Sequence, residues 1–243
     1  MKRSSAASAI ALAVLMLAMS ACSGGSSKSA TSTPEATATS AQSATFTTEQ
    51  AQTLLADASL TPQDLPTGWK TMGDTTQDNV AAATADPAHA ASIQRCGRLL
   101  GRTVANQPED VVTAYIGGET VAFFSALTVY GTVSGATDCA GEAAQRYTQP
   151  GELARAFGNL FIDPNAVTVA AVDFPQVADG SFAADLTGQI NAAGTQVALT
   201  ILVVGFRKGN VTGAVGSAGS GAPSTDELKP YVDLVVQRIG EAQ

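Results

Sequence analysis

The sequence predicts an α+β domain in which an antiparallel sheet packs against helices and is tied by one disulfide. Residues 180–215 alternate polar and apolar side chains between tight-turn sequences, which is typical of neighbouring hairpins. Helical patterns lie at both ends of the predicted domain, and two cysteines fall in other predicted helices. An α/β fold would need a regular alternation of strands and helices, which the C-terminal third lacks.

The first helix is predicted from Thr47 to about Asp57, because apolar residues recur at helical spacing after a threonine that can cap the helix. Residues 60–70, LTPQDLPTGWK, contain two prolines and a glycine, so we expect an ordered crossing segment there. Trp69 is the only tryptophan. It is expected to anchor the core, and stacking on a ligand is the alternative.

The middle of the chain is predicted to contain both helices and strands. Asp86-Pro87 is typical of a helix start, and one face of that helix would carry Ile93, Cys96, Leu99 and Leu100. Strands are expected over 111–116 and 121–133. Further helices are expected over 134–147, which contains Cys139, and over 149–161.

The C-terminal third has the strongest strand pattern. Residues 181–191 alternate as in a half-buried strand, and after a turn at 191–194, residues 196–206 are apolar on both faces, as in a central strand. A tight turn at 207–210 leads into a strand over 211–215. A Gly/Ser/Ala loop at 216–223 then precedes a helix from about Thr225, whose apolar stripe is formed by Leu228, Val232, Val235, Val236 and Ile239.

The N-terminus has the pattern of an export signal. Lys2 and Arg3 precede a short apolar run, which is too short to span a bilayer comfortably and ends at a Cys-Ser-Gly-Gly breaker. Met19-Ser20-Ala21-Cys22 resembles the lipobox of bacterial lipoproteins, in which the cysteine is acylated and becomes the new N-terminus. The sequence therefore predicts a lipoprotein signal peptide over 1–21 and lipidation of Cys22, which would attach the protein to the cell membrane.

Residues 22–45 are nearly all small and polar, so they predict a disordered Ser/Thr/Ala tether. Residues 46–243 suit a single extracytoplasmic domain. Removal of the signal would leave 11 basic against 21 acidic residues, a formal charge of −10. That balance disfavours nucleic acid as a partner and electrostatic adsorption to anionic lipid.

Outside the cytoplasm, Cys96 and Cys139 form an even pair once Cys22 is acylated, and a disulfide is expected between them. The alternative is a reactive thiol beside His89. His89 is the only histidine, so a zinc site lacks ligands, and no G-x-S-x-G elbow is present for a serine nucleophile. Asp173, Asp179 and Asp185 are six residues apart but do not follow EF-hand spacing, so neither a metal nor a cofactor is expected.

Small residues recur on one predicted face of the sheet. They leave either space for an apolar ligand or room for close packing. The residues are Ala184, Gly188, Ala198, Gly205, Gly213 and Ala214.

The segments LTPQDLPTGW and VVGFRKGNVTGAV, together with the lipobox, the tether and the final helix, resemble actinobacterial-type lipoproteins. Their domains are similar to the extracellular sensor of PknH-type receptor kinases or to Mog1/PsbP-like lipoproteins. The resemblance implies a non-catalytic, extracytoplasmic module that binds a small or lipidic ligand or a partner protein. A structural subunit of a cell-envelope complex is the alternative, followed by an envelope hydrolase that uses two carboxylates.

Overall fold

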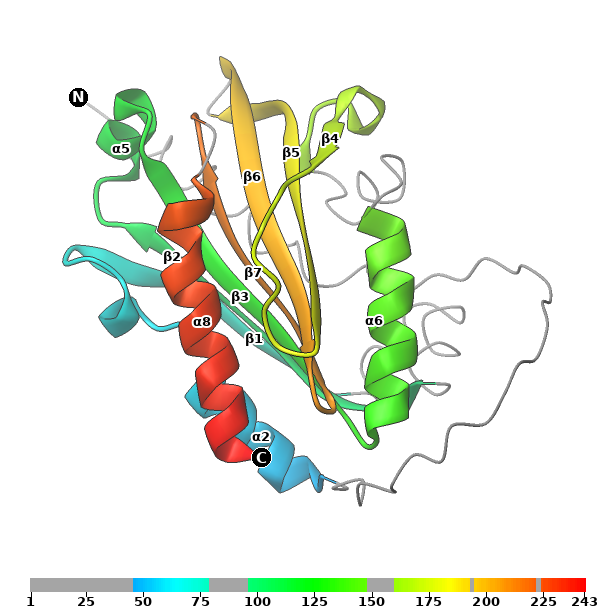
Figure 1. The fold of residues 1–243 in the computed structure, drawn as a ribbon. Coiled ribbons are helices and arrows are strands. Elements are labelled where there is room, and N and C mark those ends of the chain that lie inside the picture. The colour runs from blue at the N-terminus through cyan, green and yellow to red at the C-terminus, as the bar shows by residue number, and fades with distance from the viewer. Residues whose placement is uncertain (1–45, 79–95, 148–159, 193–194, 222–223) are drawn as a thin grey trace.

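The computed structural model describes residues 46–78, 96–147, 160–192, 195–221 and 224–243 (Figure 1). Its described strands form one antiparallel seven-stranded sheet in the order β1-β2-β3-β7-β6-β5-β4. The predicted α+β class is therefore confirmed. The strands are β1 (Trp69–Asp78), β2 (Arg98–Pro108), β3 (Thr120–Tyr130), β4 (Thr168–Ala171), β5 (Gly180–Ala192), β6 (Thr195–Lys208) and β7 (Val211–Gly219). The described helices are α2 (Thr48–Ala58), α5 (Val111–Gly117), α6 (Val133–Tyr147) and α8 (Thr225–Ala242), with short 3-10 turns η2 (Pro62–Asp64) and η4 (Pro164–Ala166).

The C-terminal meander follows the predicted hairpins. Strand β5 pairs with β6 from Gly180↔Arg207 to Ala192↔Thr195, and β6 pairs with β7 from Lys208↔Val211 onward. Gly209 makes the turn between β6 and β7 with a φ of 57°, a backbone conformation that favours glycine. β7 extends to Gly219, so the first residues of the predicted loop 216–223 belong to a strand. In the predicted turn at 191–194, positions 193–194 lie outside the described residues.

Helix α2 begins as predicted, with a reciprocal capping box. The Gln50 backbone N–H donates to the Thr47 hydroxyl at 3.2 Å, and the Thr47 N–H donates to the Gln50 side-chain oxygen at 2.9 Å. Each bond satisfies a donor that the first helical turn leaves without a partner. Local sequence is therefore sufficient to start this helix.

Helix α8 also confirms its predicted stripe, because Leu228, Val232, Val235 and Ile239 are fully buried, while Val236 is partly buried. In Figure 1, α8 and α2 lie on the same side of the sheet, over the β2, β3 and β7 strands. We call this side the α8 face.

Two apolar cores lie on opposite sides of the sheet because side chains alternate along each strand. In β6, Leu202, Val204 and Phe206 point to the α8 face, whereas Ile201 and Val203 belong to the core on the opposite face. The predicted β3 has the same alternation, with Phe123 in the first core and Phe124 in the second. β3 ends at Tyr130, three residues earlier than predicted, and the predicted helix over 134–147 is confirmed as α6.

Strand β1 was not predicted beyond the crossing segment. Its sequence, WKTMGDTTQD, is largely polar and has no apolar alternation. It becomes a strand by pairing with β2 over Trp69↔Pro108 to Asp78↔Leu100, with a register shift between Thr71 and Gly73. Pairing with a distant partner, and not local pattern, therefore defines this strand.

The helix predicted from Asp86 through Leu100 is wrong at its C-terminal end. Gly97 has a φ of 62°, and β2 begins at Arg98, so Leu99 and Leu100 are strand residues. Leu100 is paired with Asp78 on one side and Val129 on the other. Positions 79–95 of the prediction lie outside the described residues, as do positions 149–159 of the predicted helix over 149–161.

The strand predicted over 111–116 is also wrong, because this segment is helix α5. The Asp110 carboxylate accepts from the Thr113 N–H at 3.1 Å and from its hydroxyl at 2.8 Å, which caps the helix N-terminus. Gly118 ends the helix in the left-handed conformation, with a φ of 79°. These two caps outweigh the strand propensity of the Val-Val-Thr run.

Candidate functional site

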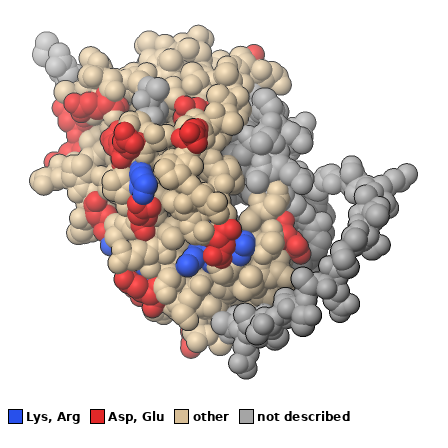
Figure 2. All heavy atoms as spheres, viewed as in Figure 1, with Lys and Arg blue, Asp and Glu red and all other residues tan. Residues whose placement is uncertain are grey.

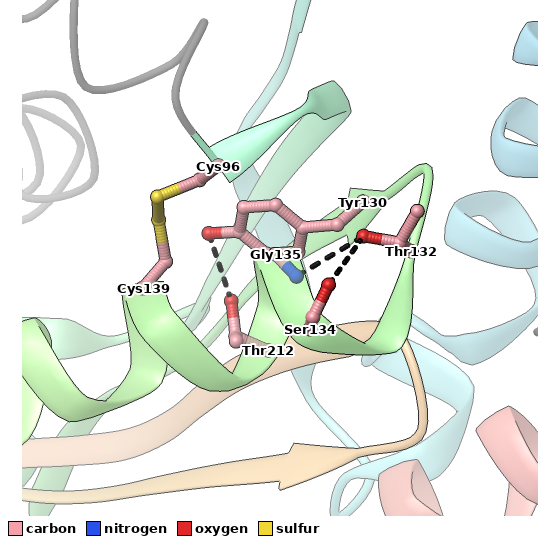
Figure 3. Close-up of a disulfide and its surroundings, with 7 residues drawn as sticks. All are labelled: Cys96, Tyr130, Thr132, Ser134, Gly135, Cys139 and Thr212. Carbon is pink, nitrogen blue, oxygen red and sulfur yellow. Dashed lines mark hydrogen bonds between the residues drawn. A yellow bond between two sulfur atoms is a disulfide. The ribbon is translucent and has the colours of Figure 1, made fainter. Parts of the chain in front are cut away.

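The predicted disulfide between Cys96 and Cys139 is present, with a Cα–Cα distance of 6.2 Å across a sequence separation of 43 (Figure 3). The two residues are buried, with exposed fractions of 2% and 7%. Cys96 lies two residues before β2, so the bond fixes the start of that strand to α6. Cys22 and His89 lie outside the described residues, so lipidation of Cys22 stays a prediction.

The disulfide requires close contact between α6 and the chain at Cys96. Gly135 faces the Cys96 carbonyl, and a Cβ at Gly135 would overlap that oxygen. The Gly135 N–H donates to the Thr132 hydroxyl at 3.1 Å at the start of the helix. The Tyr130 ring lies beside the sulfur atoms in Figure 3, and its hydroxyl accepts from Thr212 at 3.4 Å. The region around Cys96 and Cys139 is therefore tightly packed, and both sulfur atoms are bonded to each other instead of forming a reactive thiol.

Three aromatic rings from distant parts of the chain meet on the α8 face. The Phe123 ring, from the middle of β3, is 5.0 Å from the Trp69 ring and 4.7 Å from the Tyr231 ring of α8, measured between centroids. Phe123 is 1% exposed, whereas Trp69 and Tyr231 are only partly buried. Trp69 therefore packs on the core as predicted and also keeps part of its surface in solvent. We call these three residues the aromatic cluster.

A buried polar group lies next to the aromatic cluster. Asn106 is directly opposite Phe123 in the β2–β3 register and has no exposed surface. Its amide nitrogen donates to the Leu60 carbonyl at 3.4 Å, and its Oδ1 atom has no hydrogen-bond partner in the described structure. An unpaired acceptor in an apolar core is costly, so Asn106 lowers the stability of this part of the core.

The crossing segment, residues 60–70, is held against α8 by an ion pair between Asp64 and Arg238. The Arg238 guanidinium of α8 donates to both Asp64 oxygens, at 2.6 and 2.9 Å. Thr61 also donates to Asp64, from its N–H at 2.8 Å and its hydroxyl at 2.9 Å. Burial by itself would raise the pKa of Asp64, but the hydrogen bonds from Arg238 and Thr61 outweigh it and lower that pKa.

The three aspartates singled out in the sequence do not form one site. Asp173 lies in the chain between β4 and β5. Asp179 lies just before β5, at the open end of the β5–β6 hairpin, where its carboxylate accepts from the Gly209 N–H at 2.7 Å and pairs with Arg207 at 3.2 Å. Asp185 lies within β5, between Ala170 of β4 and Leu202 of β6, so neither direct cross-strand neighbour is a second carboxylate.

Asp185 is nevertheless unusual for a strand residue. Its side chain is partly buried, and its Oδ1 atom has no hydrogen-bond partner in the described structure. Burial raises the pKa of this carboxyl group, because the charged form loses hydration. The alternation along residues 181–191 predicts an outward position for Asp185. It gives no sign that the Oδ1 atom is buried without a hydrogen-bond partner.

Three of the six small residues singled out in the sequence are covered by aromatic side chains. Gly188 is covered by the Phe161 ring, Gly205 by Phe182, and Gly213 by Phe206 and Leu127. Ala184 is buried in the core of the opposite face, whereas Ala198 is exposed. Close packing, and not space for an apolar ligand, therefore fits the three glycine positions.

Charged residues are spread over the surface. The face shown in Figure 2 carries scattered acidic side chains and few basic ones, as expected from a formal net charge of −8. Within the described ranges, no group of three or more Cys, His, Asp or Glu side chains is placed to hold a metal ion. None of the helices described has both the length and the apolar character needed to cross a bilayer.

No protein-family model matches the chain. No curated protein matches it either. Among solved structures, the extracellular domain of PknH from Mycobacterium tuberculosis is similar, with a TM-score of 0.48 and 10% sequence identity over 82% of this chain and 98% of that chain.

Proposed function

We propose that this protein is a lipid-anchored, extracytoplasmic binding module without catalytic activity. The N-terminal signal pattern, the lipobox-like Met19-Ser20-Ala21-Cys22 and the polar tether support the anchored location. The Cys96–Cys139 disulfide supports an oxidising compartment, since such bonds seldom persist in the cytoplasm. Within this proposal Cys22 is the one cysteine left for acylation.

The observation that carries the binding role is the aromatic cluster. Trp69 and Tyr231 come from β1 and α8, and each leaves part of its ring in solvent while packing on buried Phe123. Aromatic rings supply large contact area with little conformational entropy to lose, which suits them to binding. The partly exposed Trp69 and Tyr231 rings therefore suit a small or lipidic ligand with a flat apolar part.

The anchor is tested on the full-length protein expressed in a bacterium. Mass spectrometry of the mature N-terminus should find cleavage before Cys22 and added acyl chains. The Cys22→Ser variant should leave the detergent phase in phase-partition experiments, whereas the Ser26→Ala variant in the tether should stay with the membrane. An unmodified Cys22, or a C22S variant that still partitions with detergent, would refute the anchor.

The binding role is tested by native mass spectrometry of protein extracted from its own membrane. A retained small molecule of fixed mass is expected, and adding it back to stripped protein should change the fluorescence of Trp69, the only tryptophan. The Tyr231→Ala variant should lose that response. The Ile116→Ala variant removes a side chain that is 79% exposed on α5 and should keep it. Purification of intact protein with no bound molecule, or an unchanged response in Y231A, would contradict the assigned site.

A further inference from the structure

A carboxylate lies beside the aromatic cluster. Glu227 of α8 is one helical turn before Tyr231, so the two side chains are neighbours on one flank of the helix. The Glu227 carboxylate accepts from the Thr120 hydroxyl, at the start of β3, at 3.3 Å. Burial, followed by the negative charge of Glu227, raises the pKa of the Tyr231 hydroxyl, which agrees with their close approach. The carboxylate is therefore held next to one of the exposed rings.

The charge of Glu227 is available to a ligand. Its side chain is exposed, and the bond from Thr120 uses the Oε2 atom, so that Oε1 is open to another donor. None of the ion pairs in the described part of the chain involves Glu227. A cation that binds here would displace no basic side chain of the described structure.

The basic side chains on the strands and the helix that form the cluster are paired or directed elsewhere. Lys229 forms an ion pair with Asp233 along α8. Arg238 donates to both oxygens of Asp64. Lys70 directly follows the tryptophan in β1, and successive side chains of a strand point to opposite faces of the sheet. These basic groups therefore do not neutralise the carboxylate.

A second carboxylate lies on the β1 side of the cluster. The backbone N–H of Glu109 donates to the Gly68 carbonyl at 2.7 Å, which brings Glu109 next to the residue that precedes Trp69. Glu109 is exposed. Figure 2 shows more acidic than basic side chains over the start of α8, which Figure 1 locates. An anionic ligand would be repelled from this region, and a cationic ligand would be attracted.

Aromatic faces and a carboxylate together select an organic cation. The face of a Trp or Tyr ring is negative, and it attracts an ammonium group that lies within about 6 Å of the ring centroid. An alkylated ammonium also gains from contact between its methyl groups and the apolar ring, which a hydrated metal ion does not. Trp69 and Tyr231 each leave part of the ring in solvent for such a contact.

We propose that the ligand of the aromatic cluster carries an organic ammonium group, which contacts the Trp69 and Tyr231 rings and pairs with Glu227. This inference rests on the proposed binding role of the cluster and adds the charge and chemical class of its ligand. The ammonium group can belong to a soluble molecule or to a lipid headgroup, and the two sources share the same contacts.

Choline and its neutral carbon counterpart, 3,3-dimethylbutan-1-ol, test the charge because the two molecules have nearly the same shape. Each is titrated into the full-length protein in a maltoside detergent, and the fluorescence of Trp69 is followed, with sodium chloride at equal concentration as the blank. Choline should give a saturable change at millimolar concentrations. It should bind at least about fivefold more tightly than the alcohol.

Variants separate the charge from the apolar contact. Glu227→Gln keeps an acceptor for Thr120 and should weaken choline binding about two- to fivefold, with no change for the alcohol. Tyr231→Leu removes the ring and should bring the affinity for choline close to that for the alcohol, whereas Tyr231→Phe should keep the difference. Glu241→Gln changes an exposed carboxylate at the other end of α8 and should alter neither affinity.

Vesicles of phosphatidylcholine identify the source of the ammonium group, because they carry it on a lipid headgroup. The Cys22→Ser variant is used here, so that no acyl anchor inserts into the vesicles. Sedimentation of this variant with the vesicles, reversed by choline, would support the proposal with a lipid as the source. Binding of choline without sedimentation would support it with a soluble molecule as the source.

Three results would overturn the proposal. Equal binding of choline and the alcohol would leave the aromatic cluster as a neutral apolar site, so this inference would fail while the proposed binding role stands. An unchanged affinity for choline in E227Q would remove the carboxylate from the site. No fluorescence response to choline would also reject the ammonium group, and the molecule retained in native mass spectrometry would still decide the binding role separately.

Discussion

The backbone N–H of Leu60 donates a hydrogen bond to the Ser125 hydroxyl at 3.0 Å, although 65 residues separate them in the chain. The Leu60 carbonyl accepts from the Asn106 side chain, so both backbone groups of one buried residue are bound by side chains of the sheet. Leu60 joins α2 to the segment that enters β1. This pair of contacts positions that segment, and with it Trp69, against β3.

Replacing Ser125 by alanine should therefore destabilise the domain. The Leu60 N–H would be left buried without an acceptor, which costs about 1–3 kcal/mol. Urea denaturation should show this as a lower midpoint with an unchanged m-value. The Ser134→Ala variant changes an exposed serine of α6 and should stay within about 0.5 kcal/mol of the parent. Equal effects for S125A and S134A would show that the Leu60 contact adds no stability.

The Asp64–Arg238 pair should make stability depend on pH. The hydrogen bonds from Arg238 and Thr61 lower the folded-state pKa of Asp64 below its ordinary value of 3.8 despite its burial. The stabilisation is therefore present above pH 3.8 and is lost as the pH falls through the folded-state pKa. At neutral pH, Asp64→Asn should lower the free energy of unfolding by about 1.5–3 kcal/mol.

Chemical denaturation at several pH values checks this prediction. The difference between the parent protein and D64N should shrink as the pH falls from 3.8 through the folded-state pKa, because Asp64 is protonated first in the unfolded chain and then in the folded protein. The Asp138→Asn variant changes an exposed aspartate of α6 and serves as the control. A difference that persists unchanged at the lowest pH would mean that charge on Asp64 is not what stabilises the segment.

The two glycines of α6 should respond to alanine in opposite directions. At Gly135 a Cβ would overlap the Cys96 carbonyl, a backbone atom that cannot rotate away, so G135A should cost about 1–3 kcal/mol or more. At Gly141 a Cβ meets nothing within 4 Å, so G141A should stabilise by about 0.5–1 kcal/mol. Thermal unfolding of both variants checks the pair. A stabilising G135A would show that α6 does not pack this closely on Cys96.

Loss of the disulfide should lower stability substantially. The double variant Cys96→Ala, Cys139→Ala opens a loop with a separation of 43 residues, for which the chain-entropy estimate is about 4 kcal/mol. Denaturation of the variant and of the reduced parent should agree. In the unreduced protein without lipid, iodoacetamide should label Cys22 alone. Labelling of Cys96 or Cys139 under those conditions would show that the bond does not form.

Asp185→Asn should stabilise the domain at neutral pH. Burial raises the folded-state pKa of this carboxyl group, so the folded protein holds the proton more tightly than the unfolded chain. The favourable contribution of the protonated form is present at low pH and is lost as the pH rises through the folded-state pKa. The gain from D185N should thus appear at pH 7 and vanish below pH 3.8, as followed by urea denaturation. A D185N variant less stable than the parent at pH 7 would be the contrary result.

Several elements could be predicted because their causes are local. α2 and α8 have apolar residues at helical spacing and side-chain caps at Thr47 and Ser224. The β5–β6–β7 meander has alternation and tight-turn residues such as Gly209. α5 was missed although a local signal was present: Asp110 before the segment and Gly118 after it mark the two ends of a helix.

The sequence by itself determined the α+β class, the meander, the first and last helices and the Cys96–Cys139 pair, because composition, periodicity and cysteine parity act within short stretches of chain. Only the tertiary structure decided that polar β1 pairs with β2, and that Trp69, Phe123 and Tyr231 meet. It also decided that Glu227 of α8 reaches Thr120 of β3. Strand register and ring contacts join residues far apart in the chain, so no local pattern encodes them.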